Sequence, residues 1–464
     1  MFKGRKEELE TLESMHGSGN FEFAVVYGRR RVGKTTLIRR FCERKRAFYF
    51  VARESSASEN LKLVSRELAA CGLASEGTVF ENWDAVLRLF AQLSQNERLI
   101  VAIDEFPYLA AAESGITSAI QAYADGSFKN SKLFLILSGS SMSFMENQIL
   151  GHKSPLYGRR TAQFKLQPFD YFVSREFLPG FSPEEQLTLY AVTGGIPEYL
   201  SKIDNTISLK ENIVRLFLTD SGIMFEEPAN LLKQELREPA VYNSLITAIA
   251  GGASKLNETS SKTGMDTNKA AKYLGVLMSL GIVKREYPAG EIRGKKSLYS
   301  LDDGMFRFYY RYVFTNMSAI TSGSGSLLYD AEIKNSLPEF CAPVFEKVCA
   351  EYLLRLQKNR KLPFFIGSLG RWWGANPHTK KPEEIDLMAI SHNKGLFCEC
   401  KWRSVPADLA VFETLAARSK LFNLDERHYI IFSKSGFDKK LQAKASALPQ
   451  LSLISFEEIN KLRD

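Results

Sequence analysis

The sequence has few of the features that mark secreted or membrane-embedded proteins. Its cysteines are scattered and include no Cys-x-x-Cys pair, which is typical of a reduced compartment rather than of a disulfide framework. The opening residues, MFKGRKEELE, do not form a signal peptide, and no apolar run approaches the length of a membrane span. We therefore expect a cytoplasmic protein without membrane contacts. The six cysteines are Cys42, Cys71, Cys341, Cys349, Cys398 and Cys400.

Composition limits the architecture as well. A chain of 464 residues is too long for one hydrophobic core, so we expect two to four domains. Hydrophobic residues make up 45% of the chain and aromatic residues 12%, which is typical of globular rather than disordered proteins. The formal net charge of +8 is compatible with nucleic-acid partners but does not require them.

A glycine-rich loop lies between an apolar strand and an amphipathic helix in the segment FEFAVVYGRRRVGKTTLIRRF. In this strand–loop–helix context the glycines let backbone N–H groups face the phosphates of ATP. Lys34 would reach the β- and γ-phosphates, and the hydroxyl of Thr35 would hold Mg²⁺. The candidate ATP-binding residues of the loop are Gly28, Arg29, Arg30, Arg31, Val32, Gly33, Lys34, Thr35 and Thr36.

A second apolar strand, RLIVAIDEF, ends in two acidic residues. Asp104 at the strand end is placed to hold the magnesium shell, and Glu105 to polarise the water that attacks the γ-phosphate. Loops often begin with acids, so this pair alone is weak evidence. The phosphate-binding loop upstream is what favours a catalytic role for it. Asp104 is therefore a candidate metal ligand, and Glu105 a candidate catalytic residue.

Two further segments bear on the nucleotide site. The buried strand in KLFLILSGSSMSFM ends at Ser138, which either senses the γ-phosphate or simply opens a turn. The segment SPLYGRRTAQFKLQPF carries Arg159 and Arg160. These arginines either neutralise transition-state charge, in cis or from a neighbouring subunit of a homo-oligomer, or form a solvated surface pair.

Together these motifs resemble those of the prokaryotic AAA+/STAND-type ATPases known as archaeal-type ATPases. The matching segments are FKGRKEELE, GRRRVGKTTL, LIVAIDEFPYL, LILSGSS, PLYGRRT and TGGIPEYL, in this order. The resemblance implies a P-loop, AAA+-like α/β core at residues 1–180 and a helical lid at 181–237. It also implies that Gly4 and Arg5 contact the nucleotide base, and TGGIPEYL is similar to the Gly-x-Pro element of the STAND lid.

The segment 238–312 is predicted to form a winged helix-turn-helix. One helix is expected in PAVYNSLITAIAGG and another in DTNKAAKYLGVLMSLG, with Asp266 as its N-cap and Gly281 as its C-terminal stop. The alternating segment IVKREYPAGEIRGKKSLYSL then predicts a β-wing around Gly290 and Gly294.

The role of this module stays open at the level of sequence. Lysine and arginine number 11 against 6 acidic residues across 254–312. Modules of this kind place a helix in the major groove of DNA, whereas in ATPases of this type they often pack against protein. The residues that follow, 313–330, are rich in glycine and serine and are predicted to be a linker.

A β-hairpin is predicted in EEIDLMAISHNKGLFCECKW, with HNKG as its turn. In the expected register Ser391 pairs with Leu396. Asp386 then lies opposite Lys401, and Glu399 is its diagonal neighbour on the same face, roughly 7 Å away. Two carboxylates around a Mg²⁺ suit phosphodiester hydrolysis, because the metal polarises the phosphate and activates water. Lys401 would stabilise or orient the nucleophile.

The pattern Asp-x₁₂-Glu-Cys-Lys resembles the signature of the PD-(D/E)xK nucleases, although Ile385 stands where that signature has proline. Residues 331–464 as a whole are similar to the nuclease-like domain of unknown function that accompanies these ATPases, with PVFEKVCAEYLLRL as its first helix. The resemblance implies a restriction-endonuclease-like α/β fold. It also implies that Asp386 and Glu399 hold Mg²⁺ or Mn²⁺ and that Glu346 completes the site.

Two functions remain for the whole chain. The first is ATP binding and hydrolysis coupled to metal-dependent cleavage of DNA. The second is a signalling or regulatory ATPase whose C-terminal domain binds nucleic acid or protein without cutting it, since such folds can lose catalysis and keep the scaffold. Glu399 and Lys401 would then be a solvated ion pair worth under about 1 kcal/mol. Cys398 and Cys400 lack further ligands and are expected to face the core.

Overall fold

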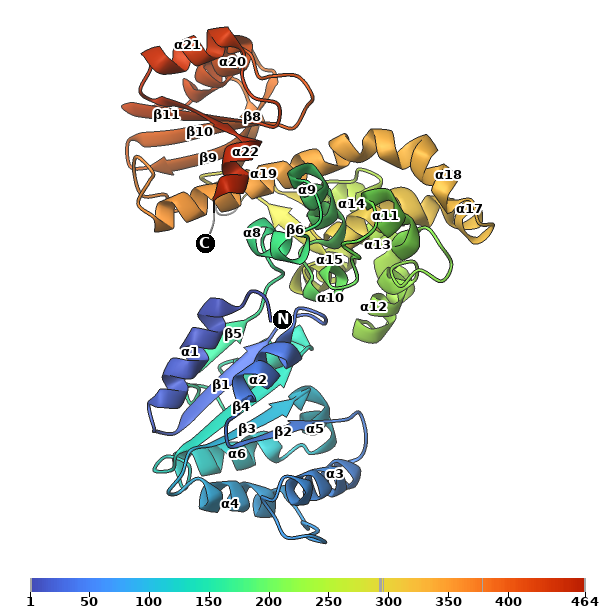
Figure 1. Ribbon diagram of the computed structural model, residues 1–464, viewed down its shortest axis with the longest axis vertical. Helices are drawn as coiled ribbons and strands as arrows, with labels where there is room; N and C mark the ends of the chain where they lie inside the picture. Colours follow the sequence, from blue (N-terminus) through green and yellow to red (C-terminus); the bar gives the residue numbers. More distant parts are fainter. Residues whose placement is uncertain (1, 292–293, 295, 378, 463–464) are drawn as a thin grey trace. The chain divides into compact units, whose positions relative to one another are not determined.

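The chain folds into two compact units, which are drawn in Figure 1. The first unit consists of Met1–Pro168 and Ile196–Glu198, and the second of Phe169–Gly195 and Tyr199–Asp464. None of the helices in the described ranges is both long enough and apolar enough to cross a bilayer. The computed structural model describes residues 2–291, 294, 296–377 and 379–462.

The first unit is built on a parallel five-stranded sheet with the strand order β2-β3-β4-β1-β5. Its strands are β1 (Glu22–Tyr27), β2 (Ala47–Val51), β3 (Leu99–Asp104), β4 (Leu133–Gly139) and β5 (Ala162–Lys165). Its helices are α1 (Lys6–Gly17), α2 (Lys34–Cys42), α3 (Ala57–Ala70), α4 (Trp83–Leu93), α5 (Phe106–Ala112), α6 (Ile116–Asp125) and α7 (Met142–Phe144), the last continued by a π-turn at Met145–Ile149.

The burial of the central strands is typical of a parallel sheet with helices packed on both faces. β3 and β4 are buried along their whole length, and β1 along all but its first residue. Continuous apolar strands of this kind need helices on both faces. Because the strands are parallel, the carboxyl ends of β1, β3 and β4 lie at one edge of the sheet. The phosphate-binding loop, Asp104 and Ser138 meet at that edge, so the P-loop α/β core expected from the sequence is confirmed.

The second unit begins with short helices in the region predicted to be the lid. Serine capping boxes start two of them, at Ser182 with Glu185 and at Ser208 with Glu211. The unit begins at Phe169, so residues 169–180, which were assigned to the ATPase core, belong to it. The helices are α8 (Tyr171–Ser174), continued by a 3₁₀ turn at Arg175–Phe177, α9 (Pro183–Thr193), α11 (Leu209–Phe217) and α12 (Glu227–Glu235). The short helix α10 (Pro197–Leu200) begins in the first unit and ends in the second.

The middle segment contains helices followed by a hairpin. Asp266 accepts hydrogen bonds from the N–H groups of Asn268 and Lys269, and Gly281 has a φ of +67°, so both predicted helix boundaries are confirmed. The order of elements is the one that a winged helix requires, and the winged-helix assignment stays a prediction. The predicted wing includes residues 292–293 and 295, which lie outside the described residues. The elements are α13 (Pro239–Ala250), α14 (Leu256–Thr263), α15 (Thr267–Ser279), β6 (Val283–Glu286) and β7 (Leu298–Leu301).

Residues 313–330 are helical and packed rather than a linker. Ile320 is buried, and Gly325 lies so close to the backbone that a Cβ there would come within 1.9 Å of the carbonyl oxygen of Leu218. Glycine is used here for close packing, which composition alone does not distinguish from flexibility. The elements are α16 (Gly304–Phe308), a π-turn (Tyr309–Val313), a 3₁₀ turn (Phe314–Asn316), α17 (Met317–Thr321), α18 (Gly325–Leu328) and a second π-turn (Tyr329–Ile333).

The C-terminal part of the second unit is a mixed five-stranded sheet with the order β12-β11-β10-β9-β8. The pairs β8–β9 and β9–β10 are antiparallel, and β10–β11 and β11–β12 are parallel. The helices α19 and α20 both pack on β9 and β10. The elements are α19 (Lys334–Lys358), β8 (Gly370–Ala375), β9 (Pro382–Ser391), β10 (Lys394–Lys401), α20 (Leu409–Ser419), β11 (Glu426–Ser433), α21 (Lys439–Ala447), β12 (Leu451–Ser455) and α22 (Phe456–Lys461).

Candidate functional site

Two glycines shape the phosphate-binding loop. Gly33, the N-cap of α2, has a φ of +91°, and a Cβ at Gly28 would lie 2.5 Å from the carbonyl oxygen of Leu166. The buried ammonium group of Lys34 donates to the carbonyl oxygens of Gly28 (2.9 Å) and Arg29 (3.1 Å). The loop therefore keeps a positive charge at the N-terminus of α2, where the helix dipole also favours an anion.

The predicted magnesium residues contact each other directly. The Thr35 hydroxyl donates to Asp104 Oδ2 at 2.7 Å, and the Tyr49 hydroxyl donates to the same oxygen at 2.6 Å. Burial, followed by the charge of Asp104, raises the pKa of Tyr49 well above its usual range, so this hydroxyl stays protonated and keeps donating. Asp104 is thus held by two hydroxyl donors at the end of β3, one from the phosphate-binding loop and one from β2.

Glu105 has an unusual backbone and a fixed side chain. Its φ is +50°, in the left-handed region that non-glycine residues rarely adopt. Its Oε2 accepts hydrogen bonds from the hydroxyl (2.8 Å) and the N–H (3.3 Å) of Ser140. Ser138, level with Val26 of β1, is fully buried, and its Oγ has no hydrogen-bond partner among the described residues. A buried hydroxyl without a partner is costly, which suits a group that waits for a ligand.

The remaining loop residues divide into buried and exposed positions. Arg29 and Val32 are buried, whereas Thr36 on α2 is exposed. Arg30 donates from Nη2 to the Tyr108 hydroxyl at 2.9 Å, which links the loop to α5. The structure thus gives Arg29, Arg30 and Val32 supporting positions around the loop.

The Gly-x-Pro element contributes directly to the first unit. The pyrrolidine ring of Pro197 lies beside the loop. Its Cγ is 3.9 Å from the point where a Cβ on Gly33 would be. The N–H of Glu198 also approaches the carbonyl oxygen of Arg31 at 3.5 Å, and Arg31 itself has a left-handed φ of +71°. This segment therefore contacts the phosphate-binding loop, although its flanking residues belong to the second unit.

Gly4 and Arg5 precede α1 and adopt left-handed backbone conformations, with φ values of +66° and +58°. The guanidinium of Arg5 donates to the carbonyl oxygens of Val32 (2.9 Å) and Gln167 (2.5 Å) and pairs with Glu8 at 3.1 Å. Arg5 therefore braces the loop backbone. A contact with a nucleotide base, which the family resemblance implied, stays a prediction.

The two candidate arginine fingers have different surroundings. Arg159 forms a two-point ion pair with Asp125 of α6, at 2.8 Å from Nε and 2.7 Å from Nη2. Arg160 lies near the rings of Tyr157 and Tyr27, and its buried Nη1 has no hydrogen-bond partner in the described part of the chain. Tyr27 is the last residue of β1, directly before the loop. Arg160 is therefore the better placed of the two for a role at the nucleotide.

The C-terminal hairpin forms, but its register differs from the predicted one by two residues. Ser391 pairs with Lys394 rather than with Leu396. The turn is tighter than expected, because His392 and Asn393 alone connect the paired residues, and His392 has a left-handed φ of +54°. A shift of two residues preserves which face each side chain takes in a regular strand, so the predicted faces survive although the predicted partners were wrong.

A β-bulge lies where the candidate acid is found. Between two regular pairs of β8 and β9, Arg371 alone stands opposite two residues of β9, Asp386 and Leu387. The pairing of β9 with β10 also ends at Leu387, and the N–H of Cys400 donates to the Asp386 side chain, at 2.7 Å from Oδ2. Bulges re-aim side chains and are over-represented beside active sites. In the observed register Asp386 is level with Glu399, not with Lys401.

Burial and a neighbouring carboxylate raise the pKa values of two acids here. Burial, followed by the charge of Glu399, raises the pKa of Asp386 to about 6. Burial, followed by the charge of Asp386, raises the pKa of Glu346 on α19 to about 7. Ionised carboxylates held this close repel each other, and a divalent cation relieves the repulsion. Oxygen-only donors of this kind fit Mg²⁺ or Mn²⁺.

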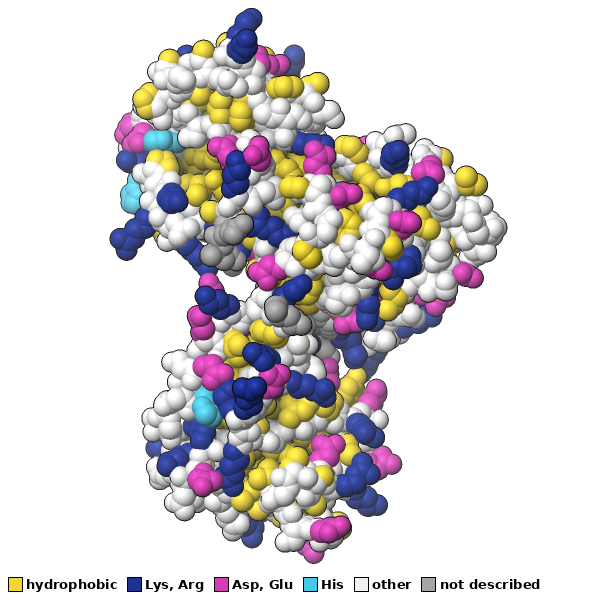
Figure 2. Space-filling model, viewed as in Figure 1, with side chains coloured by type: hydrophobic (Ala, Val, Ile, Leu, Met, Phe, Trp, Pro, Cys, Tyr) yellow, Lys and Arg dark blue, Asp and Glu magenta, His cyan; other side chains and the backbone are white. Residues whose placement is uncertain are grey.

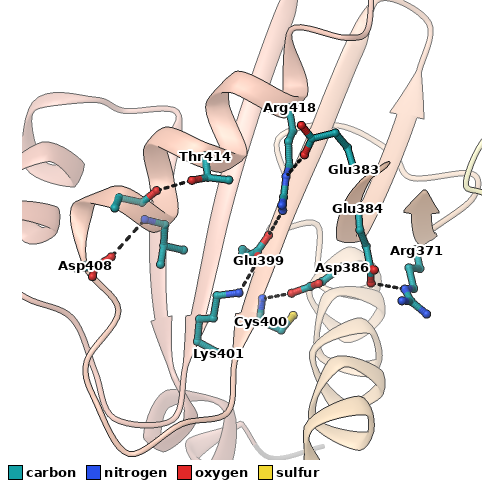
Figure 3. A network of polar contacts seen from close by, with 12 residues as sticks. Arg371, Glu383, Glu384, Asp386, Glu399, Cys400, Lys401, Asp408, Thr414 and Arg418 are labelled. Atoms are coloured by element: carbon teal, nitrogen blue, oxygen red, sulfur yellow. Dashed lines mark hydrogen bonds and ion pairs between the residues drawn. The ribbon is translucent and has the colours of Figure 1, made fainter. Parts of the chain in front are cut away.

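Two cations hold Glu399, as Figure 3 shows. Lys401 donates to Glu399 Oε1, and Arg418 of α20 places Nη1 at 3.6 Å from Oε2. Arg418 is itself anchored by a hydrogen bond from Nε to Glu383 at 2.9 Å. Glu399 is only 7% exposed, so these contacts balance a charge that would otherwise be costly to bury.

The cysteines and the grouping of the acidic side chains limit what the site can be. Cys398 and Cys400 are buried, and burial raises the pKa of both thiols well above the usual value, as expected for side chains that face the core. Among the described residues, no three histidine, cysteine or acidic side chains form a group that could hold a metal. The candidate acids therefore influence one another without forming a complete cage.

Sequence reasoning missed three residues of these sites. Tyr49 comes from β2, which carries no recognisable motif, and only the tertiary structure places it on Asp104. Ser140 lies two residues after Ser138 in the quoted strand, so its proximity to the site had a sequence signal. Arg418 lies on α20, the helix that follows the Glu399–Lys401 pair in the chain. Nothing in its local sequence indicates the contact with Glu399.

Two segments of the chain match models of known protein families. Residues 2–203 match the model described as "ATPase domain predominantly from Archaea", and residues 309–413 match one described as "Archaea bacterial proteins of unknown function". An uncharacterized protein of Methanocaldococcus jannaschii is 36% identical over 444 residues, which cover 94% of this chain and 96% of that protein. The chain belongs to the archaeal-type ATPases.

Two other similarities extend the comparison of this archaeal-type ATPase. An uncharacterized ATP-binding protein of M. jannaschii is 52% identical over 46 residues, which cover 10% of this chain and 78% of that protein. Among solved structures, a Walker-type ATPase of Pyrococcus abyssi superposes with a TM-score of 0.53 at 21% identity, covering 67% of this chain and 96% of that one. This likeness shows the fold. The chain is accordingly an ATP-binding P-loop ATPase.

Proposed function

We propose that this P-loop ATPase couples ATP hydrolysis, as a STAND-type switch, to Mg²⁺- or Mn²⁺-dependent cleavage of DNA in its C-terminal domain. The observation that carries the nuclease half is the position of Asp386 on the bulge of β9, level with Glu399 and close enough for its charge to raise the pKa of Glu346. Lys401, on Glu399, completes the set. Acids whose pKa values are raised by mutual repulsion are candidates for metal ligands rather than for structural ion pairs.

At the nucleotide site, each proposed role follows from a contact. Lys34 would exchange its two carbonyl partners for the phosphates of ATP, and Thr35 with Asp104 would hold the Mg²⁺ shell. Glu105, whose orientation is set by Ser140, would accept the proton of the water that attacks the γ-phosphate. Ser138 would donate its hydroxyl, which has no hydrogen-bond partner among the described residues, to the γ-phosphate.

Variants of Arg159 and Arg160 test the proposed mechanism of ATP hydrolysis. Arg160→Ala should lower ATP turnover at least about 10-fold, because transition-state charge loses a guanidinium. Arg159→Ala should change it little if the pair with Asp125 is structural. Turnover that rises with protein concentration, and is restored by mixing Arg160→Ala with Lys34→Ala protein, would place the arginine in a neighbouring subunit of a homo-oligomer. Equal losses in both single variants would contradict this assignment.

At the C-terminal site, Asp386 and Glu399 would hold the cation, which supplies charge to the scissile phosphate and lowers the pKa of its bound water. Glu346 would bind an outer water of the cation, and Lys401 would orient the attacking water. That water would add to phosphorus as the bond to one ester oxygen breaks, and a proton of the water would pass to the departing oxygen. Mg²⁺ commonly keeps several waters and needs only one or two carboxylates, so an incomplete cage does not prevent binding.

The charge distribution supports a local rather than a general attraction to DNA. Figure 2 shows basic and acidic side chains interspersed over the visible face, without one dominant basic patch. Electrostatic capture of DNA scales with the number of phosphates that a surface neutralises. The visible face therefore does not favour general capture of DNA, and we propose that binding rests on groups near the carboxylates.

A plasmid-nicking assay with Mg²⁺ or Mn²⁺, with and without ATP, tests the nuclease. Asp386→Ala and Glu399→Ala should each abolish nicking, and Lys401→Ala should abolish nicking while metal binding persists. Glu413→Ala, an exposed acid on α20, is the matched control and should nick at the wild-type rate. Nicking that survives in Asp386→Ala and Glu399→Ala would assign it to a contaminant or another site.

Two observations favour the alternative, a regulatory ATPase whose C-terminal domain binds without cutting. Lys401 and Arg418 already neutralise Glu399, and no preformed metal cage exists among the described residues. In this case ATP would still turn over, no metal would stabilise the domain, and Glu399→Ala would leave nucleic-acid binding intact. Absence of nicking together with retained ATPase activity would select this function.

A further inference from the structure

A cavity of about 740 Å³ leads to the candidate acids. Its walls come from the hairpin β6–β7, from α9 and α16, from the helix α19 and from the bulge of β9. Asp386 and Glu346 line it, so it opens onto the proposed metal site rather than onto an unrelated surface. Five basic side chains also line it: Lys284, Arg307, Arg311, Lys347 and Arg371.

The hairpin β6–β7 is fixed to the sheet that carries the acids. The N–H of Ala289 donates to the carbonyl oxygen of Arg371 at 2.8 Å, and the indole N–H of Trp373 donates to the carbonyl oxygen of Lys296 at 3.2 Å. Ala289 also packs against the apolar core of the C-terminal sheet. Two described residues of the predicted wing, Ala289 and Lys296, therefore contact β8, and the strands β6 and β7 line the cavity.

We infer that the proposed nuclease acts on single-stranded DNA, which enters this cavity with its phosphates against Lys284 and Lys347. The inference rests on the proposed nuclease function. A volume of this size is that of a small-ligand pocket, typically 300–1,000 Å³, and would enclose about two nucleotides. A duplex, whose major groove alone is about 12 Å wide, is far larger than a pocket of this volume, so we expect its backbone to reach Asp386 less readily than a single strand does.

The charges of the lining agree with a phosphate-bearing strand. Lys284 pairs with Glu286 across 2.8 Å, and Arg371 pairs with Glu384, so part of the basic charge is balanced in the protein alone. A divalent cation on Asp386 would offset the acidic side of the lining and leave the basic side chains in excess. Phosphates then have both a metal and ammonium groups as partners, as in other channels that follow a single strand.

A disulfide lock tests whether the hairpin is a fixed wall. A Cβ on Gly370 would lie 3.9 Å from the Cβ of Ala289, a separation that a disulfide accepts. The full-length Ala289→Cys/Gly370→Cys protein would be prepared on a Cys71→Ser background, because Cys71 is the exposed native thiol. Binding of a 12-nucleotide single strand and of its blunt duplex would be measured by fluorescence anisotropy in Ca²⁺, oxidised and reduced.

The oxidised protein should bind the single strand within about twofold of the reduced protein and at least about 10-fold more tightly than the duplex. Lys284→Ala and Lys347→Ala should each weaken single-strand binding several-fold, whereas Lys440→Ala, an exposed lysine on α21, should not. Loss of single-strand binding on oxidation, equal binding of the duplex, or no effect of the two lysines would each overturn the inference.

Cleavage in Mn²⁺ separates this inference from the function on which it rests. Selective binding of the single strand without cleavage would overturn the nuclease and keep the cavity as a single-strand site. Cleavage of the blunt duplex by the locked protein, at a rate equal to that of the single strand, would keep the nuclease and overturn the substrate class. Selective cleavage of the single strand supports both.

Discussion

The nucleotide site and the C-terminal acid site balance their charges in opposite ways. In the first, Asp104 is held by hydroxyl donors and Lys34 by carbonyl oxygens, so each charge has neutral partners that a ligand can replace. In the second, burial and then a neighbouring carboxylate raise the pKa values of both acids: Glu399 acts on Asp386, and Asp386 acts on Glu346. Such a site lowers the stability of the folded protein when no ligand is bound. Groups with strongly shifted pKa values are therefore candidates for functional residues.

The two sites also differ in how the chain builds them. One loop and the ends of adjacent parallel strands supply the nucleotide site, and its motif is contiguous. The acid site draws Glu346 from α19, Asp386 from a bulge, and Glu399 and Lys401 from the next strand. Four changes test whether the sites differ as described.

The largest effect is expected at Lys34. Lys34→Ala should reduce ATP turnover at least about 100-fold and abolish tight ATP binding, because the phosphates lose the point charge that the loop places at the start of α2. Calorimetry and phosphate release measure the two quantities. Lys129→Ala, an exposed lysine of the same unit, is the control. Undiminished ATP affinity in Lys34→Ala would show that the nucleotide binds elsewhere.

A smaller effect is expected at Glu105. Glu105→Gln should retain ATP affinity and slow hydrolysis by about 10²–10⁴, because an amide keeps the hydrogen bonds from Ser140 but cannot accept the proton of water. The comparison of binding with turnover separates this role from a structural one. Normal turnover in the amide variant would remove Glu105 from the mechanism.

Metal-linked stability tests the acid site without reference to cleavage. Mn²⁺ at about 100 times its dissociation constant should stabilise the wild-type protein by about 2.7 kcal/mol, provided that only the folded chain binds it. Asp386→Ala or Glu399→Ala should each remove this gain, and the double variant should lose little more, since the two acids act as a unit. If Mn²⁺ does not change the melting temperature of the wild-type protein, Glu399 and Lys401 form a structural ion pair and not part of a metal site.

The pH dependence of stability is the most subtle test. The folded pKa of Glu346 is about 7, above its unfolded value of 4.5, so the folded state holds this proton where the unfolded state releases it. The stabilisation that the proton provides is complete below pH 4.5 and is lost as pH rises through 7. In the presence of EDTA, Glu346→Gln should therefore be more stable than wild type at pH 8, by up to about 3 kcal/mol, and similar at pH 4.

Glu339→Gln on the same helix provides the control, because its acid is exposed and distant in sequence from the bulge. Denaturant or thermal unfolding at the two pH values measures the difference. Parallel pH profiles for wild type and Glu346→Gln would show that the acid is not under strain, and the contrast between the two sites would disappear.

The sequence alone determined the nucleotide site, because its motifs are local. A loop of one length between one strand and one helix constrains Gly28, Gly33 and Lys34 whatever surrounds them. It likewise determined the caps of α15, where Asp266 and Gly281 act on their own helix ends. The hairpin β9–β10 was also determined locally, but its register was not, because a two-residue turn and a longer one both satisfy the alternation.

Only the tertiary structure decided the features that depend on distant partners. The bulge that re-aims Asp386 arises from a mismatch between β8 and β9, which neither strand encodes by itself. The helices at 313–330 form although the segment is rich in glycine and serine, because Gly325 packs on the backbone of Leu218. The hairpin β6–β7 closes a cavity only through its bonds to β8. Local motifs specify a site that the backbone builds alone, whereas packing decides which charges face one another across elements.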